Sequence, residues 1–62
     1  MSHEKILGQA IRTVIEARYA STALLQRELS IPYSIASMLL DKLEALGLVS
    51  KADGVKPRKI LN

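Results

Sequence analysis

The chain has 62 residues, which suits one small domain, and 48% of them are hydrophobic, which favours a packed core over a disordered segment. It contains no cysteine, so disulfides, thiolate metal sites and thiol catalysis are excluded, as fits a reducing compartment. The formal net charge is +3 and no apolar run approaches the roughly 18 residues of a membrane span, so we expect a soluble, cytoplasmic protein with no membrane partner.

An amphipathic pattern predicts a first helix at about residues 3–18. Ser2 suits its N-cap, whereas Gly8 lies inside it and costs about 1 kcal/mol of helix propensity relative to Ala. Apolar side chains recur three and four residues apart along one face. Ile6 lies at the edge of this expected stripe, which consists of Leu7, Ala10, Ile11, Val14 and Ile15.

A second, shorter helix is predicted at about residues 22–29. Ser21 suits its N-cap, because a serine oxygen there can accept a hydrogen bond from a free backbone amide of the first turn. Leu25 and Leu29 lie one turn apart on the expected inner face, and Leu24 can add to it. The two residues before Ser21 leave room only for a very short strand.

A third helix is predicted at about residues 33–46, after a tight turn. Pro32 cannot continue the preceding helix, but it suits the first position of a new one, where its missing N–H costs nothing. Gly47 supplies a left-handed C-cap. The expected buried stripe consists of Ala36, Leu39, Leu40 and Leu43. Two helices joined by so short a turn, with strands to follow, are typical of a helix-turn-helix.

The last part of the chain, residues 48–61, predicts a β-hairpin. The pair Asp53-Gly54 favours a type I′ turn, and Pro57 confines the returning strand to an edge position. Ile60 and Leu61 close over the core, although only one of them can point inward in a regular strand. A hairpin directly after the third helix is a wing. The sequence therefore predicts an α+β, mainly α, winged helix-turn-helix that occupies the whole chain as one domain.

The excess positive charge is concentrated in the last third of the chain. Residues 1–41 carry four basic and four acidic side chains, whereas residues 42–62 carry five basic and two acidic ones. The wing contributes four of these cations, namely Lys51, Lys56, Arg58 and Lys59. If about four of them contact DNA phosphates, the logarithm of affinity falls with that of salt at a slope near −3.6. The alternative is a solvated hairpin that only protects a sheet edge.

A set of short motifs runs through the last two thirds of the chain. In order, they are Ala20-Ser21, Leu25-Gln26-Arg27, Ile31, Tyr33, Ala36, Leu39, Asp41-x-Leu43-Glu44, Gly47-x-Val49 and Ala52-Asp53-Gly54-x-Lys56-Pro57-Arg58. The last motif is the most specific, because a generic winged helix needs no hairpin turn joined to Lys-Pro-Arg. In these motifs the chain resembles the C-terminal gamma domain of the FtsK/SpoIIIE DNA translocases, as a stand-alone relative or as an excised domain.

The resemblance implies a winged helix that recognises short, oriented, G-rich duplex sequences to direct a motor, and that also contacts the XerD recombinase. No Gly-rich phosphate loop occurs in this chain, so ATP hydrolysis is excluded for it. The family typically places Asn and Arg at the head of the third helix and another Arg one turn later, where they read bases. This chain has Ser34, Ile35 and Met38 there, and none of them can give the bidentate contact to guanine that is worth about 1–3 kcal/mol. We therefore expect double-stranded DNA as a partner, without the family's target sequence.

The outer face of the third helix leaves three interpretations open. It carries Ser34, Ile35, Ser37, Met38 and Lys42. In the first, Ser34 bonds a base or a phosphate and Ile35 touches a thymine methyl group. In the second, Ile35 and Met38, bordered by Tyr33, form an apolar patch that binds a protein or a second copy of the chain. In the third, both side chains pack against Tyr33 or the wing and enlarge a small core.

The sequence thus predicts a binding module rather than an enzyme, with no cofactor and no metal. Ser21 and Ser30 lack any His–Asp arrangement, and His3, the only histidine, has no cysteine or nearby carboxylate pair for a metal site. The predicted DNA-binding residues are Arg27, Ser34, Ser37, Lys42, Lys51, Lys56, Arg58 and Lys59. The alternative is a protein-interaction module, either homodimeric or bound to a recombinase-type partner, with contacts at Tyr33, Ile35 and Met38.

Overall fold

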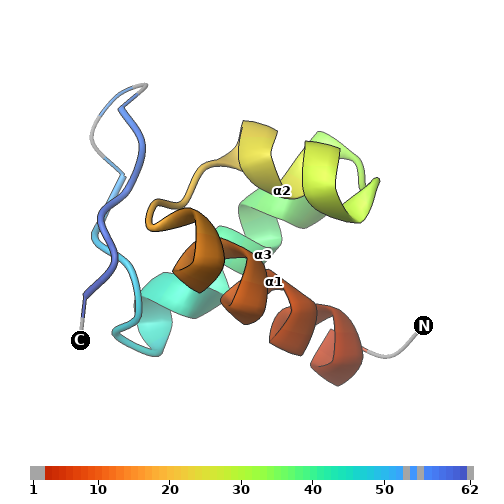
Figure 1. The fold of residues 1–62 in the computed structure, drawn as a ribbon, viewed down its shortest axis with the longest axis horizontal. Helices are drawn as coiled ribbons and strands as arrows, with labels where there is room; N and C mark the ends of the chain where they lie inside the picture. The colour runs from red at the N-terminus through yellow and green to blue at the C-terminus, as the bar shows by residue number, and fades with distance from the viewer. Residues whose placement is uncertain (1–2, 53, 55, 62) are drawn as a thin grey trace.

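A computed structural model of the protein describes residues 3–52, 54 and 56–61. Three helices make up most of it, α1 (His3–Ala17), α2 (Thr22–Leu29) and α3 (Tyr33–Ala45), so the mainly helical architecture is confirmed. The three helices pack against one another, and the chain after α3 runs as an extended arm beside them (Figure 1). None of the helices in these described ranges is both long enough and apolar enough to cross a membrane.

α1 ends one residue earlier than the predicted helix, because Arg18 leaves the right-handed conformation with a φ of 67°. The buried face of α1 also differs from the prediction. Ile6, Ala10 and Val14 are buried, whereas Ile15 is 55% exposed. These three buried positions are spaced four residues apart, so they drift only about 40° per step around the helix. The core-facing stripe of α1 therefore follows Ile6, Ala10 and Val14. The sequence had placed Ile6 only at the edge of this stripe.

Ser21 is the N-cap of α2, as predicted. Its Oγ accepts a hydrogen bond from the Leu24 backbone N–H at 3.0 Å, which satisfies an amide that has no partner inside the helix. Leu24 and Leu25 are buried, while Leu29 is only partly buried at the edge of the core. Leu24 therefore contributes more to the inner face of α2 than Leu29 does.

α3 begins at Tyr33, the predicted first residue, and ends at Ala45, one residue before the predicted end. Pro32 is the N-cap, one position before the helical residue it was expected to be, and its carbonyl accepts from the Ala36 N–H at 3.0 Å. The helix ends at Ala45, and Gly47 then takes a φ of 76°, the left-handed conformation expected of it. All four residues of the predicted stripe are buried, namely Ala36, Leu39, Leu40 and Leu43.

One aliphatic core cluster holds the elements together. Its largest fully buried side chains come from every part of the fold: Val14 from α1, Leu25 from α2, Leu39 and Leu43 from α3, and Val49 from the arm. Burying a side chain of this size stabilises a fold by about 1.5–3 kcal/mol. The arm therefore belongs to the folded unit, because Val49 completes the same core as the helices.

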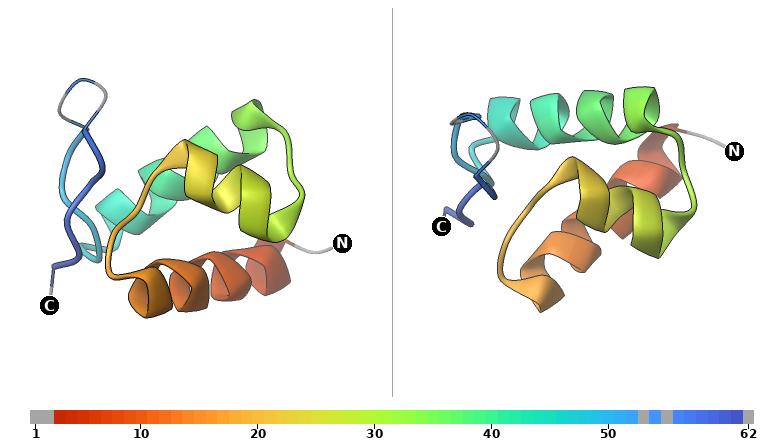
Figure 2. Two further views of the ribbon diagram at one scale, coloured as in Figure 1. Left: turned by 45° about the horizontal axis from the view of Figure 1, so that its top comes forward. Right: turned by 90° about the horizontal axis from the view of Figure 1, so that it is seen from above.

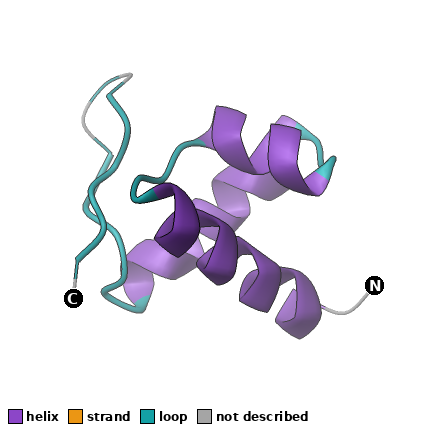
Figure 3. Cartoon of the chain, viewed as in Figure 1, coloured by secondary structure: helices purple, strands orange, loops and turns teal. Residues whose placement is uncertain are grey.

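The C-terminal arm, residues 48–52, 54 and 56–61, is paired more sparsely than the predicted hairpin. Val49 and Ile60 form an antiparallel bridge, and the Ser50 N–H donates to the Lys59 carbonyl at 2.9 Å. Within the described part of the arm this pairing does not extend into a strand, and Figure 3 draws the arm as loop. The two halves of the arm thus run antiparallel without forming a regular ladder.

The predicted turn of the arm is described only in part. Gly54 has a φ of 61°, in the left-handed region that a type I′ turn requires, whereas Asp53 lies outside the described residues. At the base of the arm, Ile60 packs against the core and Leu61 is 43% exposed. One of these two side chains points inward, as the sequence predicted.

A second bridge ties the arm to the connection between α1 and α2. The Ala20 N–H donates to the Arg58 carbonyl at 3.0 Å, and the Arg58 N–H donates to the Ala20 carbonyl at 2.7 Å. Ala20 is fully buried. The very short strand predicted before Ser21 is this isolated bridge. Figure 2 shows the arm alongside this connection in both views. The arm is therefore held both by its own pairing and by the helical body.

Candidate nucleic-acid interface

Three lysines of the arm line one shallow hollow on the protein surface, and we call them the lysine face: Lys51, Lys56 and Lys59. All three side chains are exposed. Ser50 joins the two halves of the arm beside this hollow. Its Oγ accepts a hydrogen bond from the Lys59 N–H, and its N–H donates to the Lys59 carbonyl, both at 2.9 Å. The reversal of the chain thus gathers three like charges, separated in the sequence, on one side of the arm.

A second hollow separates the arm from the helices. Ser21 and Thr22 line it at the start of α2, Tyr33 and Ser37 on α3, and Lys56 on the arm. Tyr33 is 63% exposed at this hollow. Lys56 borders both hollows, and the hydroxyl-bearing surface therefore continues into the lysine face.

Arg58, which the sequence grouped with these lysines, points toward α3 instead. Its Nη1 lies 3.1 Å from Glu44 Oε1, and its Nη2 lies 3.8 Å from Asp41 Oδ1. Its side chain is only 12% exposed, whereas that of Asp41 is 72% exposed. Alternation in an extended chain explains the difference, because Arg58 and Ile60 share the inner side while Lys59 between them faces out.

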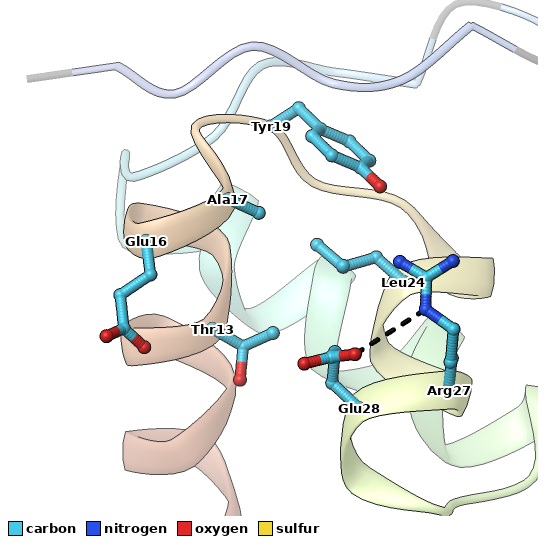
Figure 4. A pocket seen from close by; sticks show the side chains of 7 residues that line it. All are labelled: Thr13, Glu16, Ala17, Tyr19, Leu24, Arg27 and Glu28. Atoms are coloured by element: carbon cyan, nitrogen blue, oxygen red, sulfur yellow. Dashed lines mark ion pairs between the residues drawn. The ribbon is translucent and has the colours of Figure 1, made fainter.

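Arg27 lies away from the lysine face, in a groove between α1 and α2 (Figure 4). Its Nε lies 3.5 Å from Glu28 Oε2, and both side chains are more than half exposed. A hydrogen bond with Tyr19, and then one with Glu28, raise the pKa of the Arg27 guanidinium. The predicted DNA-binding residues are therefore not all adjacent, since this groove is lined by α1, α2 and their connection.

The other predicted residues lie on α3, outside its buried stripe. Ser34 and Lys42 are exposed, and Ser37 borders the hollow beside the arm. Ile35 and Met38 are partly buried and pack against the core cluster. Of the three interpretations of this helix face, the burial of these two side chains favours the one in which they enlarge the core.

The exposed apolar surface lies elsewhere, at a place that the sequence analysis missed. Ile15 is 55% exposed and Leu46 is 58% exposed. Ile15 and Leu61 border an apolar hollow between α1 and the base of the arm, whose remaining lining is Ile11, Val14, Leu48 and Ile60. The position of Ile15 could have indicated this surface, because Ile15 lies outside the arc of α1 that contains the buried Ile6, Ala10 and Val14.

Known proteins resemble this chain over nearly its whole length. The family model of the FtsK gamma domain matches residues 1–62. Over 58 residues, or 94% of its length, the chain is 45% identical to the DNA translocase FtsK of Clostridium acetobutylicum, 43% identical to that of Clostridium tetani and 38% identical to that of Streptococcus pyogenes. The chain spans 8%, 8% and 7% of the lengths of these relatives. The resemblance drawn from the motifs is confirmed, and the chain belongs to the FtsK gamma domain family.

Proposed function

We propose that this chain is a double-stranded DNA-binding module whose lysine face holds the phosphate backbone. The single observation that carries the proposal is that the arm gathers Lys51, Lys56 and Lys59 at one hollow. Lysine ammonium groups that neutralise phosphates release condensed counterions, which drives binding without reading sequence. Membership of a family whose relatives are named DNA translocases supports DNA as the polyanion.

In this function the arm acts as the wing of a winged helix-turn-helix, and α3 lies in the adjacent major groove. Ser34, Ser37 and Lys42 then lie toward the duplex, and the backbone passes the hollow between α3 and the arm. Hydroxyl groups suit contacts that position a protein on DNA, because the bidentate contacts that specify guanine come from Arg or Lys side chains. The module works in the cytoplasm in this proposal, and it has no catalytic role of its own.

The test is a titration of a mixed-sequence duplex by fluorescence anisotropy at several salt concentrations. Three phosphate contacts give a log–log slope of about −2.7 for the wild-type chain. Lys51→Ala/Lys59→Ala should reduce the steepness of this slope by about 1.8. The matched control is Lys5→Ala/Arg12→Ala, which removes two exposed positive charges from α1 and should leave the slope near that of the wild type.

Thermal unfolding monitored by circular dichroism establishes that both variants remain folded. Binding that does not respond to salt, or equal losses of slope in the lysine-face variant and the α1 variant, would contradict the proposal.

A second candidate is a protein-contact module, either homodimeric or bound to a recombinase-type partner. The observation that favours it is the apolar hollow bordered by exposed Ile15 and Leu61. Exposed Tyr33 with partly buried Ile35 and Met38 is the other candidate surface. Sedimentation velocity of the wild type, Ile15→Arg and Ile35→Arg distinguishes these surfaces. A wild-type monomer at all concentrations removes the homodimer, and a dimer lost in one variant identifies its interface.

A further inference from the structure

We infer that Arg58 is a positioning residue, which sets the direction of the C-terminal arm and so of the lysine face, and that it is not itself a phosphate ligand. The binding test of this inference rests on the proposed function, because the direction of the lysine face affects DNA affinity only if that face binds DNA. The geometry that carries it lies within the protein, where this one residue of the arm is joined both to the connection between α1 and α2 and to α3.

The backbone of Arg58 is the first of these connections. Two hydrogen bonds, at 3.0 and 2.7 Å, join it to Ala20, which is fully buried in the connection between α1 and α2. Ser21 follows immediately and caps α2. Arg58 therefore anchors the returning half of the arm to a point of the helical body that cannot move without disturbing the core and the start of α2.

The side chain of Arg58 makes the second connection, to α3. Its guanidinium meets Glu44 at 3.1 Å and Asp41 at 3.8 Å, and these two carboxylates lie three residues apart on one side of the helix. The Nη1 group donates a hydrogen bond to Glu44, while Nη2 forms a longer ion pair with Asp41, and a planar guanidinium held at both nitrogens is fixed in direction as well as distance. Because only 12% of the Arg58 side chain is exposed, water screens the contact with Glu44 less than it screens a surface ion pair.

The same carboxylates make Arg58 a poor phosphate ligand. Arg58 is among the residues that line the hollow between α3 and the arm. A phosphate that approached its guanidinium there would also approach the negative charges of Asp41, which is 72% exposed, and of Glu44. Lys59, the next residue along the chain, faces outward at the lysine face, and the described residues that line this face include no carboxylate. The positive charge of Arg58 is thus used within the protein, and that of its neighbour is presented to the ligand.

The two possible roles of Arg58 predict opposite signs for one substitution. If Arg58 contacted phosphate, Glu44→Gln would strengthen DNA binding, because it removes a negative charge and releases the guanidinium. If Arg58 positions the arm, Glu44→Gln weakens binding although the chain becomes more positive. Glu28→Gln is the matched control, since it removes the same charge from α2, where Glu28 pairs with Arg27.

The experiment measures DNA affinity of the wild type, Glu44→Gln, Glu28→Gln, Arg58→Met and Arg58→Met/Glu44→Gln at one moderate salt concentration. We expect Glu44→Gln to lose about threefold, because the amide oxygen of Gln can still accept from the guanidinium, and Arg58→Met to lose about fivefold or more, because it removes the contact altogether. The double variant should lose no more than Arg58→Met, because both substitutions break one contact. A gain of affinity in Glu44→Gln, or losses that multiply in the double variant, would overturn the inference.

Amide hydrogen exchange of the free protein supplies a readout that needs no DNA. In Glu44→Gln, the N–H groups of Ala20 and Arg58 should exchange at least about threefold faster than in the wild type, while that of Leu39 in α3 keeps its rate. Unchanged exchange at Ala20 and Arg58 refutes the positioning role even if affinity falls. A wild type without salt-dependent DNA binding refutes the proposed function instead, so the two failures are distinguishable.

Discussion

Ala20 and Arg58 exchange a pair of backbone hydrogen bonds, and Ala20 has no exposed surface at all. The arm therefore approaches the helical body where the smallest chiral side chain is enclosed by the core. A larger residue at position 20 would either displace the arm or open the core, since a close-packed interior has no spare volume. The two residues together set the distance between the arm and the helices.

Two glycines predict opposite effects of the same substitution. Gly47 has a φ of 76°, so Gly47→Ala should destabilise the fold by about 1–2 kcal/mol. Gly8 lies inside α1, and an added Cβ there would meet open space, so Gly8→Ala should stabilise the fold by about 0.5–1 kcal/mol. Urea unfolding curves measure both. Effects of the same sign would contradict the backbone conformations described above.

The N-cap of α2 is expected to contribute to stability. Ser21→Ala removes the oxygen that accepts from the Leu24 N–H, and it should cost about 1 kcal/mol of unfolding free energy. Ser34→Ala is the control, because Ser34 is exposed and should change stability by less than about 0.5 kcal/mol. Thermal unfolding of the two variants gives the comparison. Equal shifts in Tm would mean that the cap hydrogen bond contributes nothing.

The position of Arg27 predicts a weak effect on DNA binding. Arg27→Ala should change the affinity less than about twofold and leave the salt slope unchanged, because its guanidinium lies with Tyr19 and Glu28 between α1 and α2. Lys59→Ala should reduce the steepness of the slope by about 0.9, as one lost phosphate contact does. Anisotropy titrations decide the matter. A comparable loss of slope in Arg27→Ala would extend the DNA footprint to α2, as the sequence first suggested.

The uncharged outer surface near the start of α3 predicts little preference for guanine. Duplexes rich in G·C and in A·T pairs should bind the wild type within about threefold of each other, because phosphate contacts carry no sequence information. Ser34→Arg would add a bidentate donor at an exposed position and should raise the preference for a G-containing site by about fivefold or more. Competition titrations with paired duplexes measure both ratios. A strong preference in the wild type would mean that serine or backbone groups read bases.

Local features of the fold could be predicted because they depend on neighbouring residues. The cap at Ser21, the left-handed Gly47 and the buried stripe of α3 all follow from spacings of a few positions. The buried edge of α1 could not be fixed in this way. Ile6 and Ile15 lie at opposite edges of the apolar arc of α1, and only the packing of the other elements decides that Ile6 is covered and Ile15 is not.

The candidate site shows the same limit. Charge counting found the three residues of the lysine face, since the excess positive charge of the chain lies in residues 42–62. It could not separate Arg58 from them, because the carboxylates of Asp41 and Glu44 are brought to the guanidinium by the packing of the arm on α3. Charge is visible in a sequence, whereas its compensation depends on tertiary contacts.

The sequence has two tyrosines, no phenylalanine and no tryptophan, so its ultraviolet emission comes from Tyr19 and Tyr33 alone. Tyr19 lies beside Arg27 in the groove between α1 and α2, and Tyr33 stands at the rim of the hollow that faces the arm. The fluorescence of the two tyrosines therefore reports on different surfaces of the protein. A Tyr19→Phe chain would leave one intrinsic optical reporter, placed where the duplex is proposed to pass, with no label attached.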